Sequence, residues 1–159
     1  MRQLRMRKTP LSDLPGVQLP EGFALRRATE ADRAGILAVL AECFPESEWT
    51  LDKVAAEILG IPGSLGTFVV EKELAIVACA TAVVWPDHPD EGYVHYVGVL
   101  AEARGNGLGY WVSVAVLHAF AAHGLRVSVL DTDNHRLSAI SIYLKLGFEP
   151  HMIEDDHVE

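Results

Sequence analysis

A long segment without charge constrains this chain more than any other feature. Residues 108–123 contain no Asp, Glu, Lys or Arg, and Gly124 follows directly. Glycine often ends a helix, and an apolar helix of this length must be buried on most of its sides. The segment therefore predicts a helix that packs against a sheet and needs further cover, for which a partner subunit is one source.

The rest of the pattern alternates short helices with strands. Thr29 is followed by Asp32 as in a capping box, and Thr50 also stands at an N-cap position. Asp133 or Asn134 is expected to cap the final helix. The predicted helices cover residues 29–43, 50–59, 108–123 and 133–146. The predicted strands cover 23–27, 67–70, 75–85, 93–99, 125–129 and 148–153, with residues 71–73 linking the second to the third.

This alternation favours one α/β (α+β) domain, with a sheet covered by helices on both faces. With 159 residues, half of them hydrophobic, the chain has room for one sizeable core. We expect the domain over residues 22–153. Residues 1–21 contain three prolines and predict an extended arm, and residues 154–159 predict an acidic tail.

The composition excludes several classes of protein. A formal net charge of −9 argues against a nucleic-acid binder, and the longest apolar run, residues 74–85, is too short to span a bilayer. Cys43 and Cys79 lie in apolar segments, which predicts a reducing, cytoplasmic setting without a disulfide framework. The seven histidines show no spacing typical of a metal site, so no metal is expected.

The glycine cluster just before the charge-free helix predicts an anion site. A strand end at Val97 to Val99 is followed by Arg104 and by three alternating glycines at 105, 107 and 109. Glycine lets an anion approach the backbone closely, and the first amides of a helix have no internal acceptor. Asp and Glu are absent from the first turn, as expected where a phosphate binds instead. The alternative is that the glycines only ease packing between helix and sheet.

The spacing of these glycines fits neither a P-loop nor a dinucleotide fingerprint. It does match the acetyl-CoA signature of the GNAT (Gcn5-related N-acetyltransferase) family, Arg/Gln-x-x-Gly-x-Gly/Ala, as Arg104-Gly105-Asn106-Gly107-Leu108-Gly109. The segment Asp131-Thr132-Asp133-Asn134, followed by Tyr143 and by Lys145-Leu146-Gly147-Phe148-Glu149, resembles the family's second motif. The resemblance implies a GNAT-like acyl-CoA N-acyltransferase fold, with a mixed sheet of about six or seven strands.

The resemblance also implies a set of site residues. Acetyl-CoA would bind through strand residues, the glycine loop and a downstream Asn, namely Val97, Gly98, Val99, Arg104, Gly105, Asn106, Gly107, Leu108, Gly109, Tyr110 and Asn134. The Val99 amide would donate to the developing oxyanion, and Tyr143 would protonate the departing thiolate. The general base is open between His95, Tyr93, Asp131 and water, because the strand lacks the Glu that some family members use.

These residues predict an acetyl-CoA-dependent N-acetyltransferase that acts on a primary amine of a small molecule or a peptide. The missing Glu keeps a second hypothesis open, a GNAT module that senses acetyl-CoA without catalysis. The resemblance does not identify the acceptor and leaves open whether the protein is a homodimer.

Overall fold

The fold is a mixed sheet with two layers of helices, seen in a computed structural model that describes residues 3–151. Within these residues, seven strands follow the order β2-β3-β4-β5-β6-β1-β7. Only the β5–β6 pair is parallel. The strands are β1 (Gln3–Lys8), β2 (Phe23–Arg27), β3 (Ser64–Lys72), β4 (Ala75–Val83), β5 (Glu91–Val99), β6 (Val127–Asp133) and β7 (Glu149–Pro150). Residues 152–153 of the last predicted strand and the predicted acidic tail lie outside the described residues.

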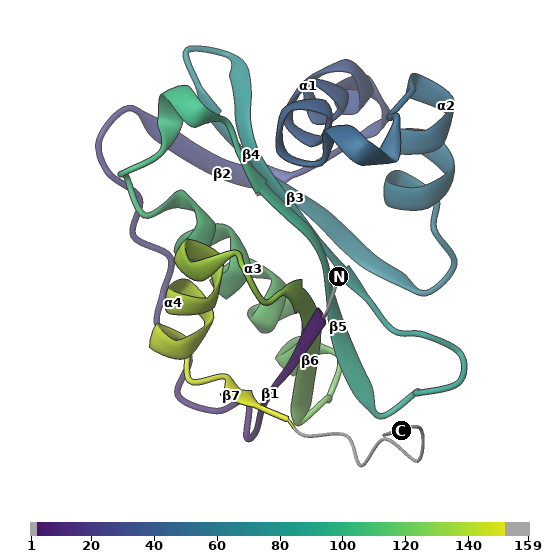
Figure 1. The fold of residues 1–159 in the computed structure, drawn as a ribbon, viewed down its shortest axis with the longest axis vertical. Coiled ribbons are helices and arrows are strands. Elements are labelled where there is room, and N and C mark those ends of the chain that lie inside the picture. Colours follow the sequence, from purple (N-terminus) through teal and green to yellow (C-terminus); the bar gives the residue numbers. More distant parts are fainter. Residues whose placement is uncertain (1–2, 152–159) are drawn as a thin grey trace.

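Helices cover both faces of the sheet, as predicted. They are α1 (Arg33–Cys43), α2 (Leu51–Val54), α3 (Leu108–Ala122) and α4 (Leu137–Lys145). Figure 1 shows α1 and α2 together on one side of the strands, and α3 and α4 on the other. Among the helices of residues 3–151, none has the length and apolar content needed to cross a lipid bilayer.

Both predicted N-cap residues cap a helical turn: Thr50 caps α2, and Thr29 caps a 3-10 turn, Glu30–Asp32, that leads into α1. The Thr29 hydroxyl accepts from the Ala31 amide, and the Asp32 carboxylate accepts from the Thr29 amide at 2.7 Å, so the capping box is present. Thr50 accepts from the amide of Lys53 at 3.1 Å and begins α2, which continues as a π-helical turn over Ala55–Leu59. Each cap satisfies amides that the first turn of a helix leaves without a partner.

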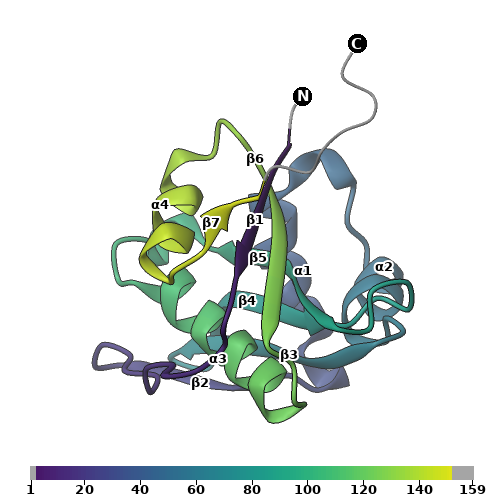
Figure 2. The same cartoon turned by 90° about the horizontal axis from the view of Figure 1, so that it is seen from below.

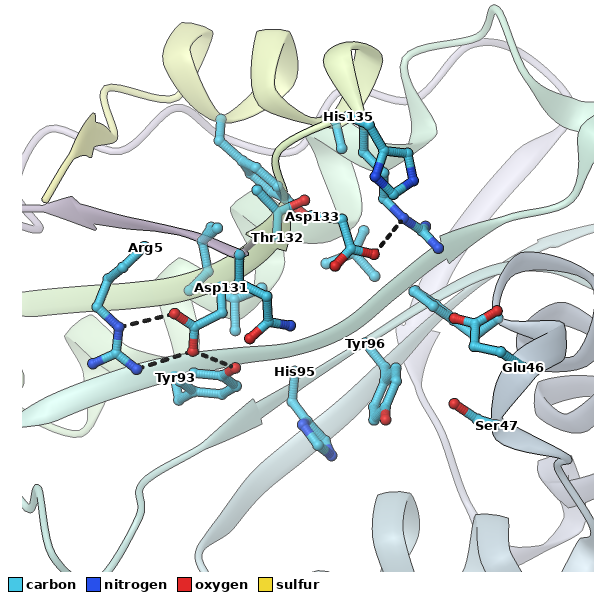
Figure 3. Close-up of a pocket in the computed structure, with 18 of the residues that line it drawn as sticks. Arg5, Glu46, Ser47, Tyr93, His95, Tyr96, Asp131, Thr132, Asp133 and His135 are labelled. Carbon is cyan, nitrogen blue, oxygen red and sulfur yellow. Dashed lines mark hydrogen bonds and ion pairs between the residues drawn. The ribbon is translucent and has the colours of Figure 1, made fainter. Parts of the chain in front are cut away.

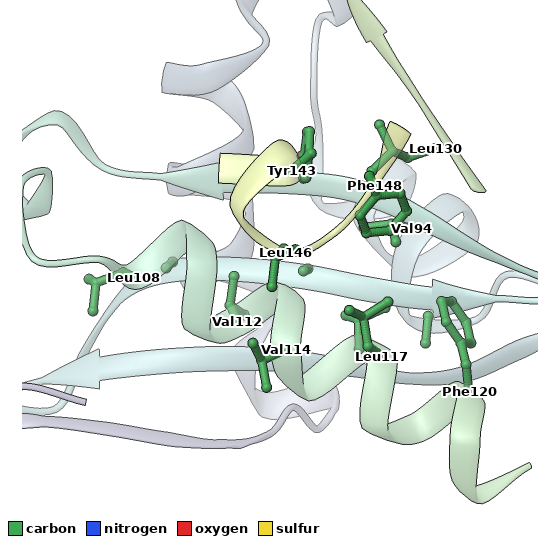
Figure 4. Packing of buried hydrophobic residues seen from close by; sticks show 14 of the residues in the cluster. Val94, Leu108, Val112, Val114, Leu117, Phe120, Leu130, Tyr143, Leu146 and Phe148 are labelled. Carbon is green, nitrogen blue, oxygen red and sulfur yellow. The ribbon is translucent and has the colours of Figure 1, made fainter. Parts of the chain in front are cut away.

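Helix α3 lies against the sheet and carries the largest part of the core. Leu108, Val112, Leu117 and Phe120 are at most 2% exposed and pack with side chains from the strands and α4 (Figure 4). Strand β5 leaves room for the Phe120 ring at Gly92, because a Cβ on this residue would lie 2.3 Å from the ring. This packing explains why the charge-free segment forms a buried helix.

The segment before β2 covers the part of α3 that the sheet leaves open, as a partner subunit could have done. Leu11, Leu14 and Leu19 of the segment before β2 pack on the same core. A ring nitrogen of His118, on the outer face of α3, lies 2.7 Å from the carbonyl oxygen of Pro15. A partner subunit is therefore not required to bury this helix.

The first part of the predicted arm is a strand of the sheet. Residues 3–8 form β1, which lies between β6 and β7 and pairs antiparallel with both (Figure 2). Met6 is completely buried in the core, whereas Arg5 on the opposite face pairs with β6. Leu4 and Met6 alternate with Arg5 and Arg7 as in a strand, but the alternation covers only four residues and was not enough to separate a strand from the arm.

Two local predictions are corrected. The β3–β4 turn lies at Glu73 and Leu74, which have φ of 51° and 68°, so β3 continues through residues 71 and 72 of the predicted link and β4 begins at Ala75 as predicted. Helix α4 begins only at Leu137, its N-cap is Arg136, and no side chain caps it. The cap expected at Asp133 or Asn134 is therefore wrong, because β6 continues to residue 133 and a turn follows before the helix.

Candidate active site

The site lies where two neighbouring parallel strands separate. The ladder between β5 and β6 covers only residues 91–93 and 127–129, after which the strands diverge. A bulge in β5 shifts its register with β4, and Tyr96 within it has a φ of 46°. The bulge places the neighbouring side chains of His95 and Tyr96 on the same face of the sheet, where their rings are in contact at 4.6 Å between centroids.

The bulge leaves backbone groups of β5 facing the gap between β5 and β6. The Leu100 amide donates to the Val77 carbonyl of the neighbouring strand at 2.8 Å, and Gly98 pairs with Cys79 in the same ladder. In an antiparallel ladder the residue between two such pairs directs its N–H and C=O to the other side. The N–H of Val99 therefore points away from β4, toward the gap.

The glycine loop ends in open amides at the N-terminus of α3. Gly105 and Gly107 have φ of 86° and 73°, the left-handed region that glycine adopts without strain. Gly107 is the N-cap, and no side chain caps the helix. Within the residues that the structure describes, the first amide of α3 that has a backbone acceptor is that of Trp111, which donates to the Gly107 carbonyl at 3.1 Å. The loop therefore presents unpaired donors at the positive end of a buried helix.

A cavity of about 450 Å³ opens in front of these amides, and we call it the glycine-loop cavity. The predicted cofactor-binding residues that line it are Val97, Gly98, Val99, Arg104, Gly105, Gly107, Leu108 and Gly109. Three predicted cofactor-binding residues do not line it: Asn106, Tyr110 and Asn134. The Asn106 side chain instead donates to the Ala103 carbonyl at 2.9 Å, which fixes the shape of the loop.

A second cavity, of about 710 Å³, lies over β5, β6 and β1 between the segment after α1 and helix α4, and we call it the sheet-face cavity. An ion pair forms part of its floor, because the Arg5 guanidinium donates to both carboxylate oxygens of Asp131 at 2.9 Å (Figure 3). The Tyr93 hydroxyl donates to the same carboxylate at 3.0 Å. Burial raises the pKa of Tyr93 above its ordinary value, and the Asp131 carboxylate adds to this.

His95 also lines the sheet-face cavity. Its Nε2 lies 3.0 Å from the Glu57 carbonyl, which can only accept, so Nε2 carries the proton and Nδ1 keeps a lone pair. Burial lowers the pKa of His95 below 6.5. The ring is therefore a neutral base at physiological pH.

Tyr143 stands where the two cavities meet, because it lines both of them. Its ring packs edge-on against Phe148 at 5.9 Å, and 8% of the residue is exposed. Burial raises the pKa of Tyr143 to about 12, against a small opposing effect of the Arg136 charge. The hydroxyl is thus protonated at neutral pH and available to donate a hydrogen bond.

Arg136 and Glu46 line the site without having been predicted from the sequence. The Arg136 side chain donates to the Cys43 carbonyl at 3.3 Å, lies 3.5 Å from the Asp133 carboxylate and covers the Phe44 ring at 4.7 Å. It therefore joins the end of α1 to the loop after β6. Neither residue belongs to a motif, so only the fold brings them to the site. Within residues 3–151, no group of three or more His, Cys, Asp or Glu is arranged to hold a metal ion.

Comparison with known proteins agrees with this geometry. The sequence model of the Acetyltransferase (GNAT) family matches residues 33–148. A curated relative, the mycothiol acetyltransferase of Streptomyces griseus subsp. griseus, is 35% identical over 164 aligned positions, covering 97% of this chain and 52% of the relative. That of Nocardia farcinica is 33% identical, covering 86% and 48%. The chain thus spans about half the length of the curated relatives it matches.

Solved structures show the same fold. A GCN5-related N-acetyltransferase from Sphaerobacter thermophilus superposes with a TM-score of 0.75 at 20% identity, covering 94% of this chain and 48% of that one. A tandem GNAT protein from the clavulanic acid biosynthesis pathway gives 0.73 at 17% identity, covering 94% and 50%. The strand order, the open glycine loop and the match over residues 33–148 lead to one conclusion: the chain belongs to the acetyltransferase (GNAT) family.

Proposed function

We propose that this chain transfers an acetyl group from acetyl-CoA to a primary amine of a small molecule. The observation that carries the proposal is that the glycine-loop cavity and the sheet-face cavity meet at Tyr143. One cavity offers open amides for an anion, and the other offers polar and aromatic side chains for a second molecule. A transfer reaction needs two substrates whose reacting atoms meet at one point.

The glycine-loop cavity has the donors that a diphosphate needs. The amides of residues 105–110 and the guanidinium of Arg104 would hold the pyrophosphate of acetyl-CoA, and the backbone of Val97 and Val99 would hold its pantetheine arm. The absence of Asp and Glu from the first turn of α3 removes the charge that would repel it.

Acetyl-CoA supplies an activated acyl group, and the protein positions the groups that move charge. As the new N–C bond forms and the C–S bond breaks, the Val99 N–H donates to the developing oxyanion. The Tyr143 hydroxyl donates to the departing sulfur, which leaves as the thiol. The amine loses one proton, and the acceptor becomes an amide.

His95 is the general base that the contacts favour. Asp131 is less suited, because both of its oxygens accept from Arg5 and one also accepts from Tyr93. Tyr93 is itself a donor with a raised pKa. The Nδ1 lone pair of His95 remains for an acceptor proton, taken through a water molecule where the ring does not reach it.

Two observations bear on the acceptor. The curated relatives are named mycothiol acetyltransferases, which supports a small molecule rather than a peptide. The net charge of −9 disfavours a nucleic-acid partner. A sensor without catalysis is the second candidate, favoured by the lack of a Glu on β5 at the gap.

The experiment that separates the two candidates measures thiol release from acetyl-CoA with a panel of primary amines. Transfer to an amine supports the enzyme, and tight CoA binding without thiol release for every amine supports the sensor. In an active enzyme, Tyr143→Phe is expected to lower kcat roughly 100-fold while Kd for CoA stays unchanged. An unchanged kcat would remove the role of the hydroxyl as the acid.

A further inference from the structure

We propose that the sheet-face cavity selects amine acceptors that carry a second positive charge, with alkyl diamines as the substrate class and Glu46 as the residue that holds the distal ammonium. The inference rests on the proposed function and names the chemistry of its acceptor. The inference is based on the ion pairs in the cavity, which account for every charged side chain of the lining except Glu46.

Most of the charged side chains that line the sheet-face cavity neutralise one another. Arg5 pairs with Asp131 through two hydrogen bonds, and Arg136 pairs with Asp133 at 3.5 Å. Glu46 is the remaining carboxylate, and no Lys, Arg or His of residues 3–151 lies within ion-pair distance of it. With the histidines counted as neutral, the cavity keeps one negative charge.

Aromatic rings form the wall beside this carboxylate. Tyr96 contacts the rings of Phe44 at 5.1 Å and His95 at 4.6 Å, and Trp85 packs on His95 at 5.6 Å. Figure 3 shows Glu46 and Ser47 at the Tyr96 end of the cavity, away from Arg5. Aromatic faces attract cations, and the Arg136 guanidinium already lies over Phe44. Phe44 is thus already covered by a cation, and the Tyr96 ring and the Glu46 carboxylate are what the wall offers to a cationic group.

The backbone that carries Glu46 is held from both ends. Glu46 lies in a short 3-10 helix, Pro45–Ser47, whose first residue is a proline. The Lys53 ammonium binds the Ser47 carbonyl and covers the Trp49 ring at 4.7 Å, which keeps this cation engaged elsewhere. A backbone held in this way limits the region that the exposed Glu46 side chain reaches, so less conformational entropy is lost when it binds a cation.

The chemistry of transfer requires that the two ends of a diamine differ. The reacting nitrogen must lose its proton before it attacks, whereas the distal nitrogen stays protonated because an alkyl ammonium has a pKa near ~10. The distal charge can then remain at Glu46 while the neutral nitrogen is directed to Tyr143. An acceptor with a distal carboxylate would bring like charges together in the same place.

Three acceptors of similar length test the inference: 1,4-diaminobutane, 1-aminobutane and 4-aminobutanoate. They carry a positive, no and a negative distal charge. We expect kcat/KM to fall in that order, by roughly five-fold at each step. Glu46→Gln should reduce the ratio between diamine and aminobutanoate at least five-fold. Glu48→Gln is the matched control, since Glu48 is exposed in the same loop but does not line the cavity.

The outcomes separate the inference from the proposed function. Transfer to all three amines with equal or reversed preference would overturn the inference and leave the enzyme standing. An equal loss of preference in the Glu46 and Glu48 variants would assign the effect to overall charge, and Glu46 would lose its role. Thiol release with none of these three, together with transfer to another amine of the panel, would overturn the inference alone, and no release with any amine despite CoA binding would overturn both.

Discussion

Replacing Gly107 by Glu tests the anion site at the start of α3. Gly107 is the N-cap of the helix and has a φ of 73°. A side chain there costs about 1 kcal/mol in the left-handed region. The larger effect is on binding, because two unit charges about 5 Å apart repel by about 3 kcal/mol at an effective dielectric constant of about 20. This corresponds to a roughly 100-fold higher Kd for CoA.

Gly124→Glu is the matched control at the other end of the same helix. Gly124 has a φ of 89°, and a Cβ there would have no heavy atom within 4 Å. Both variants carry the same added charge and similar backbone strain, but the helix dipole favours a carboxylate at the N-terminus and disfavours one after the C-terminus, so Gly124→Glu should have the lower melting temperature. Titration calorimetry with CoA should show the loss for Gly107→Glu alone, and the loss should shrink at high salt. Affinities within about three-fold of each other would refute an anion site at these amides.

Three further predictions follow from the contacts. Asp32→Asn should destabilise the protein by about 2 kcal/mol at neutral pH, since Arg26 lowers the pKa of Asp32 from 3.8 to about 2. That contribution is complete above about pH 4 and is lost as the pH falls through about 2. The free energies of unfolding of the two proteins, measured in urea, should therefore converge in acid. A difference that stays constant with pH would contradict the contribution of the Asp32 charge. Burial lowers the pKa of His95, so kcat/KM of the wild type should rise with pH through a limb that lies below pH 6.5. His95→Gln should abolish this limb, and a variant that retains it would exclude His95 as the base. Gly92→Ala should lower the free energy of unfolding by about 2 kcal/mol in urea titrations, because its methyl group would overlap the Phe120 ring; wild-type stability would show that the ring moves freely.

Features encoded by neighbouring residues were readable from the sequence. The Thr29 capping box, the buried α3 and the glycine loop each depend on a few positions close together in the chain. The same holds for the position of Tyr143 on α4, which the second motif indicated. Local patterns of this kind need no knowledge of the tertiary fold.

Features that depend on distant residues were not readable. Strand β1 was predicted as part of an arm because the strand that pairs with it is distant, and Asp131, the partner of Arg5, lies 126 positions away. Arg136 and Glu46 gain their places only when the end of α1 meets the loop after β6. The start of α4 was misplaced for a similar reason, since pairing with β1 extends β6 to residue 133.

The pairing of β1 with β6 has a consequence for how the protein is made. Arg5 is synthesised 126 residues before Asp131, its carboxylate partner on β6. The floor of the sheet-face cavity therefore closes only after β6 has been translated, whereas the contacts of β2, β3 and β4 can form earlier. Until then β1 has no partner in the sheet, because its other neighbour, β7, follows later still.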